Sequence, residues 1–167
     1  MIDELLEPYR ENLGPHYPTY RNHAHRVYEY ARIFCLQNES IKLQLCAAFH
    51  DLAIWTGNSM DYLHDSAEIA RAYTETNQPY IVSDEIVFII KNHHRLRRIK
   101  GHLEGESFRK ADLIDLSAGL IHFNIPPSLI RETESKFPRL GFTKLILNLT
   151  FHWALRHPYR PFPMIRI

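Results

Sequence analysis

The sequence has little that would direct the protein to a membrane, a secretory route or a polyanion. Its longest apolar stretches lie near Cys46–Phe49 and Ile86–Ile90, far short of the roughly 20 residues that a membrane span needs. The first residues are acidic and lack the basic-then-apolar order of a signal peptide. Lysine and arginine number 20 against 19 acidic residues, a net charge of +1. This balance argues against a nucleic-acid partner and against an anionic membrane surface.

Cysteine is also scarce. The two cysteines, Cys35 and Cys46, lie inside apolar helical patterns and form no C-x-x-C pair. We interpret them as small core residues in a reducing compartment rather than as a disulfide, which predicts a cytoplasmic protein. Repeats, low-complexity tracts and linkers are absent from the sequence, and 167 residues fit one domain, so we expect a single domain over residues 1–167.

Helical periodicity is present almost throughout and predicts an all-α fold. Caps, prolines and glycines divide the pattern into segments, with Thr19 or Asn22 as a candidate cap for the second. The predicted helices are Ile2–Leu13, Arg21–Gln37, residues 41–54, Asp61–Thr76, Asp84–His94 after Ser83, Ser107–Gly119, one opening at Pro126–Pro127, and one from Gly141 to His157. The tail Pro158–Ile167 contains three prolines and is predicted to pack along the surface without regular structure.

Histidine is over-represented, with 11 residues, and histidine is the commonest metal ligand. On the second predicted helix His23 extends an apolar stripe that includes Val27 and Tyr30, whereas His25 points elsewhere. The third predicted helix is apolar on most sides and ends by placing His50 beside Asp51. A buried aspartate is costly unless it is paired or binds a metal, so Asp51 needs a partner.

Two further helices repeat this pattern. His93 and His94 extend the apolar stripe of the fifth predicted helix, and Asp112 lies beside apolar residues on the sixth, with Asp115 three residues on. Each residue also has an ordinary structural explanation, as a hydrogen-bonded core histidine or an exposed aspartate. Two imidazoles and two carboxylates nevertheless form a plausible site for a divalent metal. Spacing alone leaves both interpretations open.

The ordered motifs resemble the HD superfamily of metal-dependent phosphohydrolases. That family has a first His in an H-x-x-R-V context, a later His-Asp pair and an Asp in an A-D-x-x-D context. The matching segments here are residues 23–27, 48–51 and 110–115, within a motif-bearing part at about 20–119, followed by C-terminal helices and tail over 120–167. The resemblance implies an HD-type helical bundle with a metal site in its core.

The resemblance also implies a ligand set. His23, His50, Asp51 and Asp112 would bind one divalent metal, which could be Mn, Fe, Co, Ni, Mg or Zn. Some HD families hold two metals with additional histidines, so further candidates for a second metal or for substrate are His64, His93 and His94.

Two family features differ in this chain. Several HD nucleotidases carry a Glu three residues after the His-Asp pair, where this chain has Ile54, and an arginine that often follows the last metal Asp is Leu113 here. We therefore expect Asp51 to be the catalytic carboxylate, with the bound metal alone or Glu106 as alternatives. Phosphate-binding cations are expected at Arg26, one helical step from His23, and at Lys110, which lies two residues before the metal-ligand candidate Asp112.

These features predict a metal-dependent hydrolase of a phosphomonoester or phosphodiester of a small metabolite, and we expect that metabolite to be a nucleotide. A metal held by two His and two Asp keeps positions open for water and a substrate oxygen. The alternatives are an HD-fold di-iron oxygenase, which requires both extra histidines, and a non-catalytic sensor that binds metal or nucleotide. The sequence leaves the substrate, the number of metals and formation of a homo-oligomer open.

Overall fold

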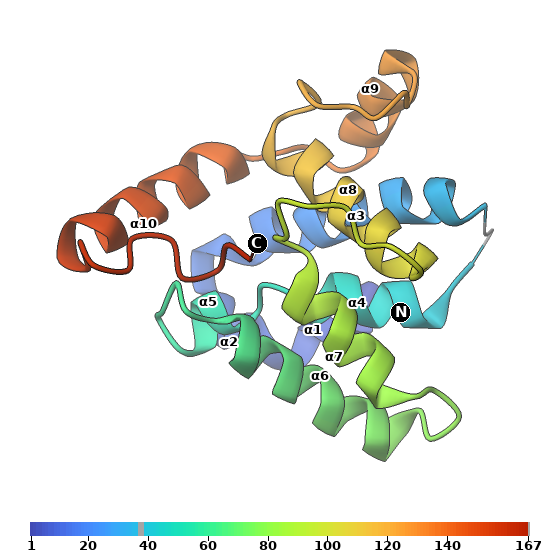
Figure 1. The fold of residues 1–167 in the computed structure, drawn as a ribbon, viewed down its shortest axis with the longest axis horizontal. Helices are drawn as coiled ribbons and strands as arrows, with labels where there is room; N and C mark the ends of the chain where they lie inside the picture. Colours follow the sequence, from blue (N-terminus) through green and yellow to red (C-terminus); the bar gives the residue numbers. More distant parts are fainter. Residues whose placement is uncertain (37–38, 167) are drawn as a thin grey trace.

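The protein is described by a computed structural model that covers residues 1–36 and 39–166. Within those ranges the chain is all-α, as the periodicity predicted, and its only β-type pairing is an isolated bridge between Arg95 and Arg166 (Figure 1). The α-helices are α1 (Ile2–Leu6), α2 (Arg10–Leu13), α3 (Tyr17–Cys35), α4 (Ile41–Phe49), α5 (Ala53–Thr56), α6 (Leu63–Asn77), α7 (Ser83–Asn92), α8 (Leu103–Leu116), α9 (Pro127–Lys136) and α10 (Phe142–Arg156). Short 3-10 turns cover Glu7–Tyr9 and Gly14–His16.

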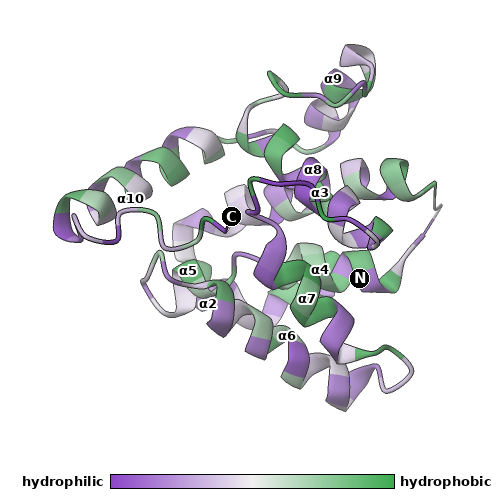
Figure 2. Ribbon diagram, viewed as in Figure 1, coloured by the Kyte–Doolittle hydropathy of each residue, from purple (hydrophilic) through white to green (hydrophobic). Residues whose placement is uncertain are grey.

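Helix α4 lies at the centre of the bundle. It contacts α1, α3, α6 and α7, while α3 packs along α8 and α6 packs along α7. Figure 2 shows α4 largely in hydrophobic colours, and every residue from Leu45 to Phe49 is buried. A helical segment that is apolar on all sides, as Leu45 to Phe49 is, is stable only when neighbours cover every side of it. Its C-terminal end, at His50 and Asp51, is therefore carried into the interior of the protein.

Two predicted helix starts are wrong. Helix α3 begins at Tyr17, with Pro18 in its first turn, rather than at Arg21. The helix starts earlier than predicted because Pro18 fixes a helical backbone angle and suits the first turn. The candidate caps Thr19 and Asn22 therefore lie inside the helix, where both are buried. The predicted end of this helix at Gln37 lies outside the described residues.

Helix α8 begins at Leu103, not after Ser107. The predicted helix over Ser107–Gly119 left out its first turn, where the His102 ring accepts a hydrogen bond from the Gly105 backbone N–H at 3.0 Å and caps the helix. Gly105 allows this close contact, since a Cβ there would lie 3.0 Å from His102 Nδ1. An imidazole cap is a less common signal than Ser, Thr, Asp or Asn, so the sequence pattern does not predict it.

Other boundaries differ in smaller ways. The predicted first helix is divided by the 3-10 turn that contains Pro8, and the predicted third helix ends at Phe49, with a turn before α5. Ser83 does not cap α7 with its side chain, because its hydroxyl donates to Glu75 instead. These differences leave His50 and Asp51 in a turn between α4 and α5.

Helix α10 extends away from the bundle, and the C-terminal tail turns back along it towards the end of α7 (Figure 1). Gly141, at φ +81°, provides the left-handed residue from which α10 starts. The tail has no helix, as predicted, and hydrogen-bonds to the backbone beyond α7: Leu96 N–H donates to the Arg166 carbonyl at 2.9 Å. The predicted tail includes Ile167, which lies outside the described residues. Among the described helices, a span both long and apolar enough to cross a bilayer is not found.

Candidate metal centre

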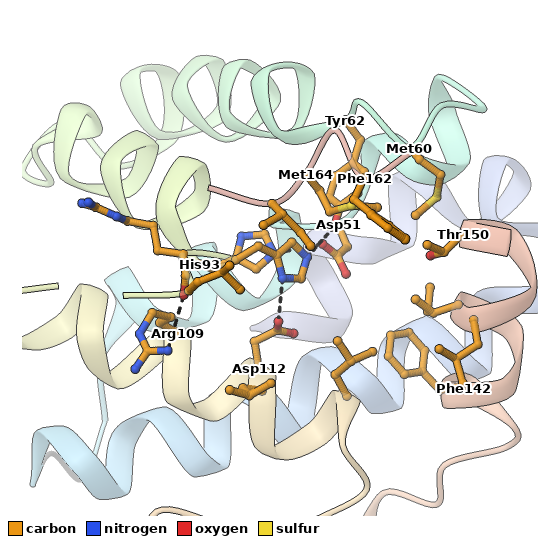
Figure 3. Close-up of a pocket in the computed structure, with 18 residues that line it drawn as sticks. Asp51, Met60, Tyr62, His93, Arg109, Asp112, Phe142, Thr150, Phe162 and Met164 are labelled. Atoms are coloured by element: carbon orange, nitrogen blue, oxygen red, sulfur yellow. Dashed lines mark hydrogen bonds and ion pairs between the residues drawn. The ribbon is translucent and has the colours of Figure 1, made fainter. Parts of the chain in front are cut away.

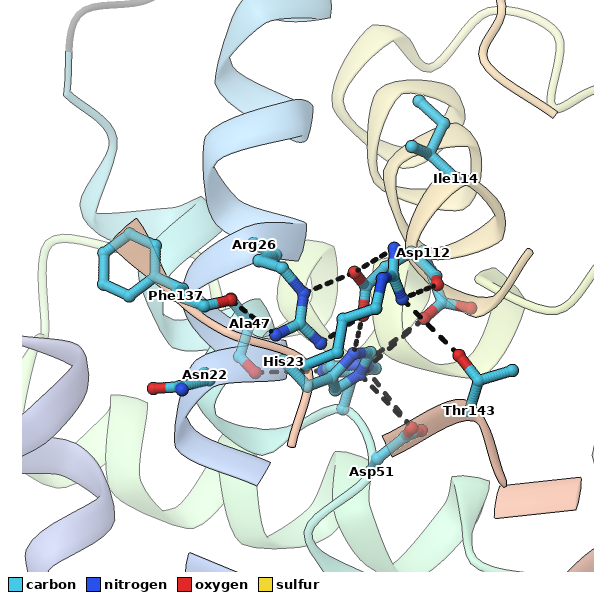
Figure 4. Close-up of polar contacts among 12 residues, drawn as sticks. Asn22, His23, Arg26, Ala47, Asp51, Asp112, Ile114, Phe137 and Thr143 are labelled. Carbon is cyan, nitrogen blue, oxygen red and sulfur yellow. Dashed lines mark hydrogen bonds and ion pairs between the residues drawn. The ribbon is translucent and has the colours of Figure 1, made fainter. Parts of the chain in front are cut away.

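Three helices bring two histidines and two aspartates together. His23 lies on α3, Asp112 lies on α8, and His50 and Asp51 follow the last residue of α4. All four side chains are buried, and one ligand atom from each lies within 4.8 Å of the others. Figure 4 shows His23, Asp51 and Asp112 converging from these separate elements. This is the set of residues that the sequence motifs predicted.

Local hydrogen bonds hold the end of α4 in place. The backbone remains helical at His50, whose N–H donates to the Cys46 carbonyl at 2.9 Å. The His50 ring donates from Nδ1 to the Ala47 carbonyl at 3.0 Å, and the Tyr20 hydroxyl donates to the Ala48 carbonyl at 2.9 Å. The His50 Nε2 atom is consequently directed at the centre of the cluster, with its orientation set by the helix itself.

The two imidazoles point their remaining nitrogens at each other. His23 Nε2 and His50 Nε2 are 2.9 Å apart, and the Nδ1 atom of each ring is already used, by Asp115 in the case of His23. Asp51 Oδ2 lies 3.7 and 3.6 Å from these two Nε2 atoms, and Asp112 Oδ1 lies 3.8 and 3.7 Å from them. The lone pairs of two Nε2 atoms that are 2.9 Å apart repel each other unless a proton or a cation lies between the two nitrogens. The donor set of two nitrogens and two oxygens suits a divalent metal.

The electrostatics of the cluster keep its carboxylates ionised. Burial raises the pKa of Asp51, but the neighbouring imidazoles of His50, His23 and His93 outweigh burial and hold the pKa well below its usual value. Burial likewise raises the pKa of Asp112, but the interaction with His50 and, after it, those with His94 and His93 bring the pKa below the usual value. Both groups are thus in the form that binds a cation.

His93 and His94 join the cluster from the end of α7. His93 Nδ1 donates to the Ile90 carbonyl at 2.7 Å, which leaves Nε2 facing Asp51 Oδ1 at 3.3 Å. Those two facing atoms are fully buried and have no hydrogen-bond partner in the described part of the chain. His94 Nδ1 lies 3.3 Å from Asp112 Oδ2. Asp51, His93 and His94 thus form a second group that could hold a metal ion.

His94 also contacts Tyr62. The Tyr62 hydroxyl lies 2.7 Å from His94 Nε2. Burial raises the pKa of Tyr62 well above its usual value, so the phenol stays protonated and donates to this nitrogen. Burial, followed by the charge of His93, lowers the pKa of His94 to about 4, so the ring is neutral at pH 7. The resulting chain runs from Tyr62 through His94 to Asp112.

The structure does not bring His64 to either group. Its side chain is 70% exposed, and its ring lies 3.9 Å from Glu68 on the same helix, α6. Of the three histidines that the sequence offered for a second metal or for substrate, His93 and His94 are therefore the two that lie beside Asp51 and Asp112.

Asp115 is a residue of the site that the sequence reasoning mentioned but gave no role. It is fully buried, accepts from His23 Nδ1 at 2.7 Å and accepts two hydrogen bonds from Arg26, at 2.6 and 2.9 Å. Burial raises the pKa of Asp115, and the bonds with His23 and Arg26 more than offset this and hold it far below its usual value. An ionised Asp115 fixes the tautomer and the orientation of His23, as a carboxylate behind a metal-binding histidine does.

The two cations expected to bind phosphate lie elsewhere. Arg26 is fully buried and donates to Asp115 and to the carbonyls of Phe137 and Pro138. Lys110 lies 4.9 Å above the ring of Phe34. Neither residue lines the cavity described next. Arg26 instead ties α3 to α8 and to the segment that precedes α10.

A cavity of about 280 Å³ opens beside Asp51 and Asp112 (Figure 3). His93, His94 and Leu113 also line it, and Leu113 contributes an apolar surface and no cation. Glu106, an alternative catalytic acid, is not part of the lining; it accepts two 2.8 Å hydrogen bonds from Arg109. Ile54 is buried in an apolar cluster with Met60 and Tyr62 and supplies no acid.

Comparison with known proteins bears on this arrangement. A family model described as HD domain matches residues 20–123. The match includes the four clustered ligand candidates, as well as His93, His94 and Asp115. No curated protein and no solved structure matches the chain.

Proposed function

The chain belongs to the HD domain family, and from this membership we propose that it is a metal-dependent phosphohydrolase acting on a phosphomonoester or phosphodiester of a small metabolite. His23, His50, Asp51 and Asp112 would hold one divalent cation. When bound, such a cation lowers the pKa of a water molecule and offsets the charge that develops on a phosphoryl group. The observation that carries the proposal is the 2.9 Å approach of two imidazole Nε2 atoms, with two ionised carboxylates beside them.

The surrounding residues have separate tasks in this proposal. Asp115 orients His23, and the Ala47 carbonyl orients His50. Asp51 and Asp112 both belong to the ligand set and line the cavity, but only Asp51 has a buried oxygen, Oδ1, without a hydrogen-bond partner in the described part of the chain, which supports its role as the catalytic acceptor of a proton. Tyr62 is hydrogen-bonded to His94, which lies beside Asp112, and both Tyr62 and His94 line the cavity, so they are placed to contact a bound substrate.

The two alternatives make different demands on the site. A di-iron oxygenase requires two extra histidines, His64 together with His93 or its neighbour His94. The exposure of His64 does not support this alternative. A sensor that binds metal without turnover is compatible with Ile54, since no acid occupies that position. Turnover is the property that separates this sensor from a hydrolase.

The test is release of inorganic phosphate or of an alcohol from a panel of phosphomonoesters and phosphodiesters, with Mn, Co, Ni and Mg each supplied. We expect release that depends on added metal and disappears with Asp51→Asn. Metal-loaded, folded protein that turns over no member of the panel would overturn the hydrolase, and retained metal in that protein would support the sensor.

A further inference from the structure

The walls of the cavity differ sharply in chemistry. The wall formed by the end of α4, the end of α7 and α8 carries Asp51, Asp112 and the two adjacent histidines. The wall formed by α10 and the tail is mostly apolar: α10 contributes Phe142 and Ile146 together with Thr150, and the tail contributes Phe162 and Met164. Figure 3 labels Phe142, Thr150, Phe162 and Met164 around this cavity. A ligand that fills the cavity therefore meets polar groups at one end and hydrocarbon along the other.

The apolar wall lies outside the part of the chain that matches the HD domain. That match ends at residue 123, whereas α10 begins at Phe142 and the tail follows it. Met164 is 7% exposed and packs with Met60 and Tyr62, and the backbone bond from Leu96 N–H to the Arg166 carbonyl holds the end of the tail against the region after α7. The wall is thus a fixed part of this chain, added to the family's own residues.

Cations within the cavity lining are few. Arg109 lines it, but its guanidinium makes two 2.8 Å hydrogen bonds to Glu106, and both side chains are 9% exposed. Arg95 is the other arginine in the lining. A substrate with several phosphates, or with a polar body, would leave unpaired polar groups against the apolar side chains of α10 and the tail, which is unfavourable.

We propose that the substrate is an amphiphile with one phosphoryl group and a small alkyl or aryl body. The phosphoryl group would lie at Asp51 and Asp112, and the body would lie against α10 and the tail. This inference rests on the proposed function and narrows its substrate class. The cavity, at about 280 Å³, lies just below the size range of about 300–1,000 Å³ for small-molecule sites, which favours a small body.

Binding of non-hydrolysable probes tests this directly. The probes are n-alkylphosphonates from methyl to hexyl, with phenylphosphonate and adenosine 5′-monophosphate, titrated calorimetrically into Mn²⁺-loaded protein. We expect affinity to rise by up to about fourfold for each added methylene until the cavity is full. We also expect hexyl- and phenylphosphonate to bind more tightly than adenosine monophosphate. Equal affinity along the series, absence of binding, or tighter binding of the nucleotide would overturn the inference.

Variants of α10 localise the effect. Ile146→Trp places a larger side chain in the part of the cavity beside α10. It should remove the dependence of affinity on alkyl chain length, while the affinity for methylphosphonate stays within about twofold. Leu147→Glu changes a lining residue that is 61% exposed, so it weakens hexylphosphonate binding without endangering the fold. Leu155→Trp is the matched control, since Leu155 is 65% exposed on the same helix and does not line the cavity. Dependence on chain length that survives both lining variants would place the body elsewhere and overturn the inference.

Hydrolysis of the matching phosphate esters is measured in parallel. Binding that depends on chain length, without release of phosphate, would count against the proposed function and leave the inference intact. Release of phosphate from the esters, with probe binding that does not depend on chain length, would support the proposed function and overturn the inference.

Discussion

His23 Nε2 and His50 Nε2 face each other at 2.9 Å in the centre of the bundle. Each ring already uses its Nδ1 atom, towards Asp115 and the Ala47 carbonyl. Burial lowers the pKa of His23, but hydrogen bonds with Asp115 and Asp51 outweigh burial and raise it above the usual value, so a proton can occupy the space between the rings. A divalent cation would take the place of that proton. The rest of the site is arranged around this contact.

Replacing Asp115 should affect both stability and metal binding. Asp115→Asn keeps the shape of the side chain but removes the charge that His23 and Arg26 share, leaving a buried arginine without its counter-charge. We expect a loss of about 3–5 kcal/mol in the free energy of unfolding, measured by urea denaturation. We also expect metal affinity to fall by roughly 10–100-fold. Glu134→Gln, which removes a more exposed partner of Arg139, is the control, and equal effects of the two changes would contradict the role of Asp115.

Arg26 should matter for stability rather than for substrate binding. Arg26→Met removes the fully buried partner of Asp115 and is expected to cost about 3–5 kcal/mol of unfolding free energy. In the fraction that remains folded, the KM for a phosphate ester should change little, because Arg26 does not line the cavity. A stable variant with a strongly raised KM would instead support the phosphate contact that the sequence motif suggested.

His64 and His93 give opposite expectations for metal binding. His64→Ala should leave the number of bound metal ions unchanged, since that side chain is 70% exposed. His93→Ala removes a buried nitrogen 3.3 Å from Asp51 Oδ1, so metal binding by the group of Asp51, His93 and His94 should weaken with it. Elemental analysis and calorimetry of both variants measure this. Loss of metal on replacing His64, with full retention on replacing His93, would contradict the arrangement.

The ion pair at the N-terminus predicts a dependence of stability on acidity. A hydrogen bond from Arg21 lowers the pKa of Asp3 from 3.8 to about 2, although burial partly opposes the shift. Because the pKa in the folded state is below that in the unfolded state, the stabilisation is present above about pH 4 and is lost as pH falls towards 2. Asp3→Asn should therefore lower the free energy of unfolding more at pH 6 than at pH 3. Glu4→Gln, at a side chain that is 84% exposed, should show no such difference.

Much of the fold follows from local sequence pattern. Helical periodicity predicted the all-α class, and the wholly apolar run in α4 predicted that His50 and Asp51 are buried. The start of α8 was missed because it depends on the imidazole cap of His102, and the start of α3 because Pro18 extends it. Local sequence pattern predicts the presence of a helix more reliably than it predicts the residue at which the helix begins.

Long-range contacts account for what the sequence could not supply. His23 and Asp115 are 92 positions apart, so the role of Asp115 appears only when α3 packs along α8. The same holds for Arg26, whose carbonyl partners at Phe137 and Pro138 lie beyond the family motifs. The apolar wall is a further case, because the tail reaches the cavity only after the chain has turned back from the end of α10.

Titration of Mn²⁺ into metal-stripped protein, comparing the unaltered chain with Asp51→Asn, tests the central claim most directly. We predict at least one equivalent bound by the unaltered protein and none by the variant, because only three of the four ligands remain charged or basic. His25→Ala should behave like the unaltered protein, since His25 contacts Asp3 and Phe137 instead of the cluster. Unchanged stoichiometry in folded Asp51→Asn would contradict the assignment of the metal centre.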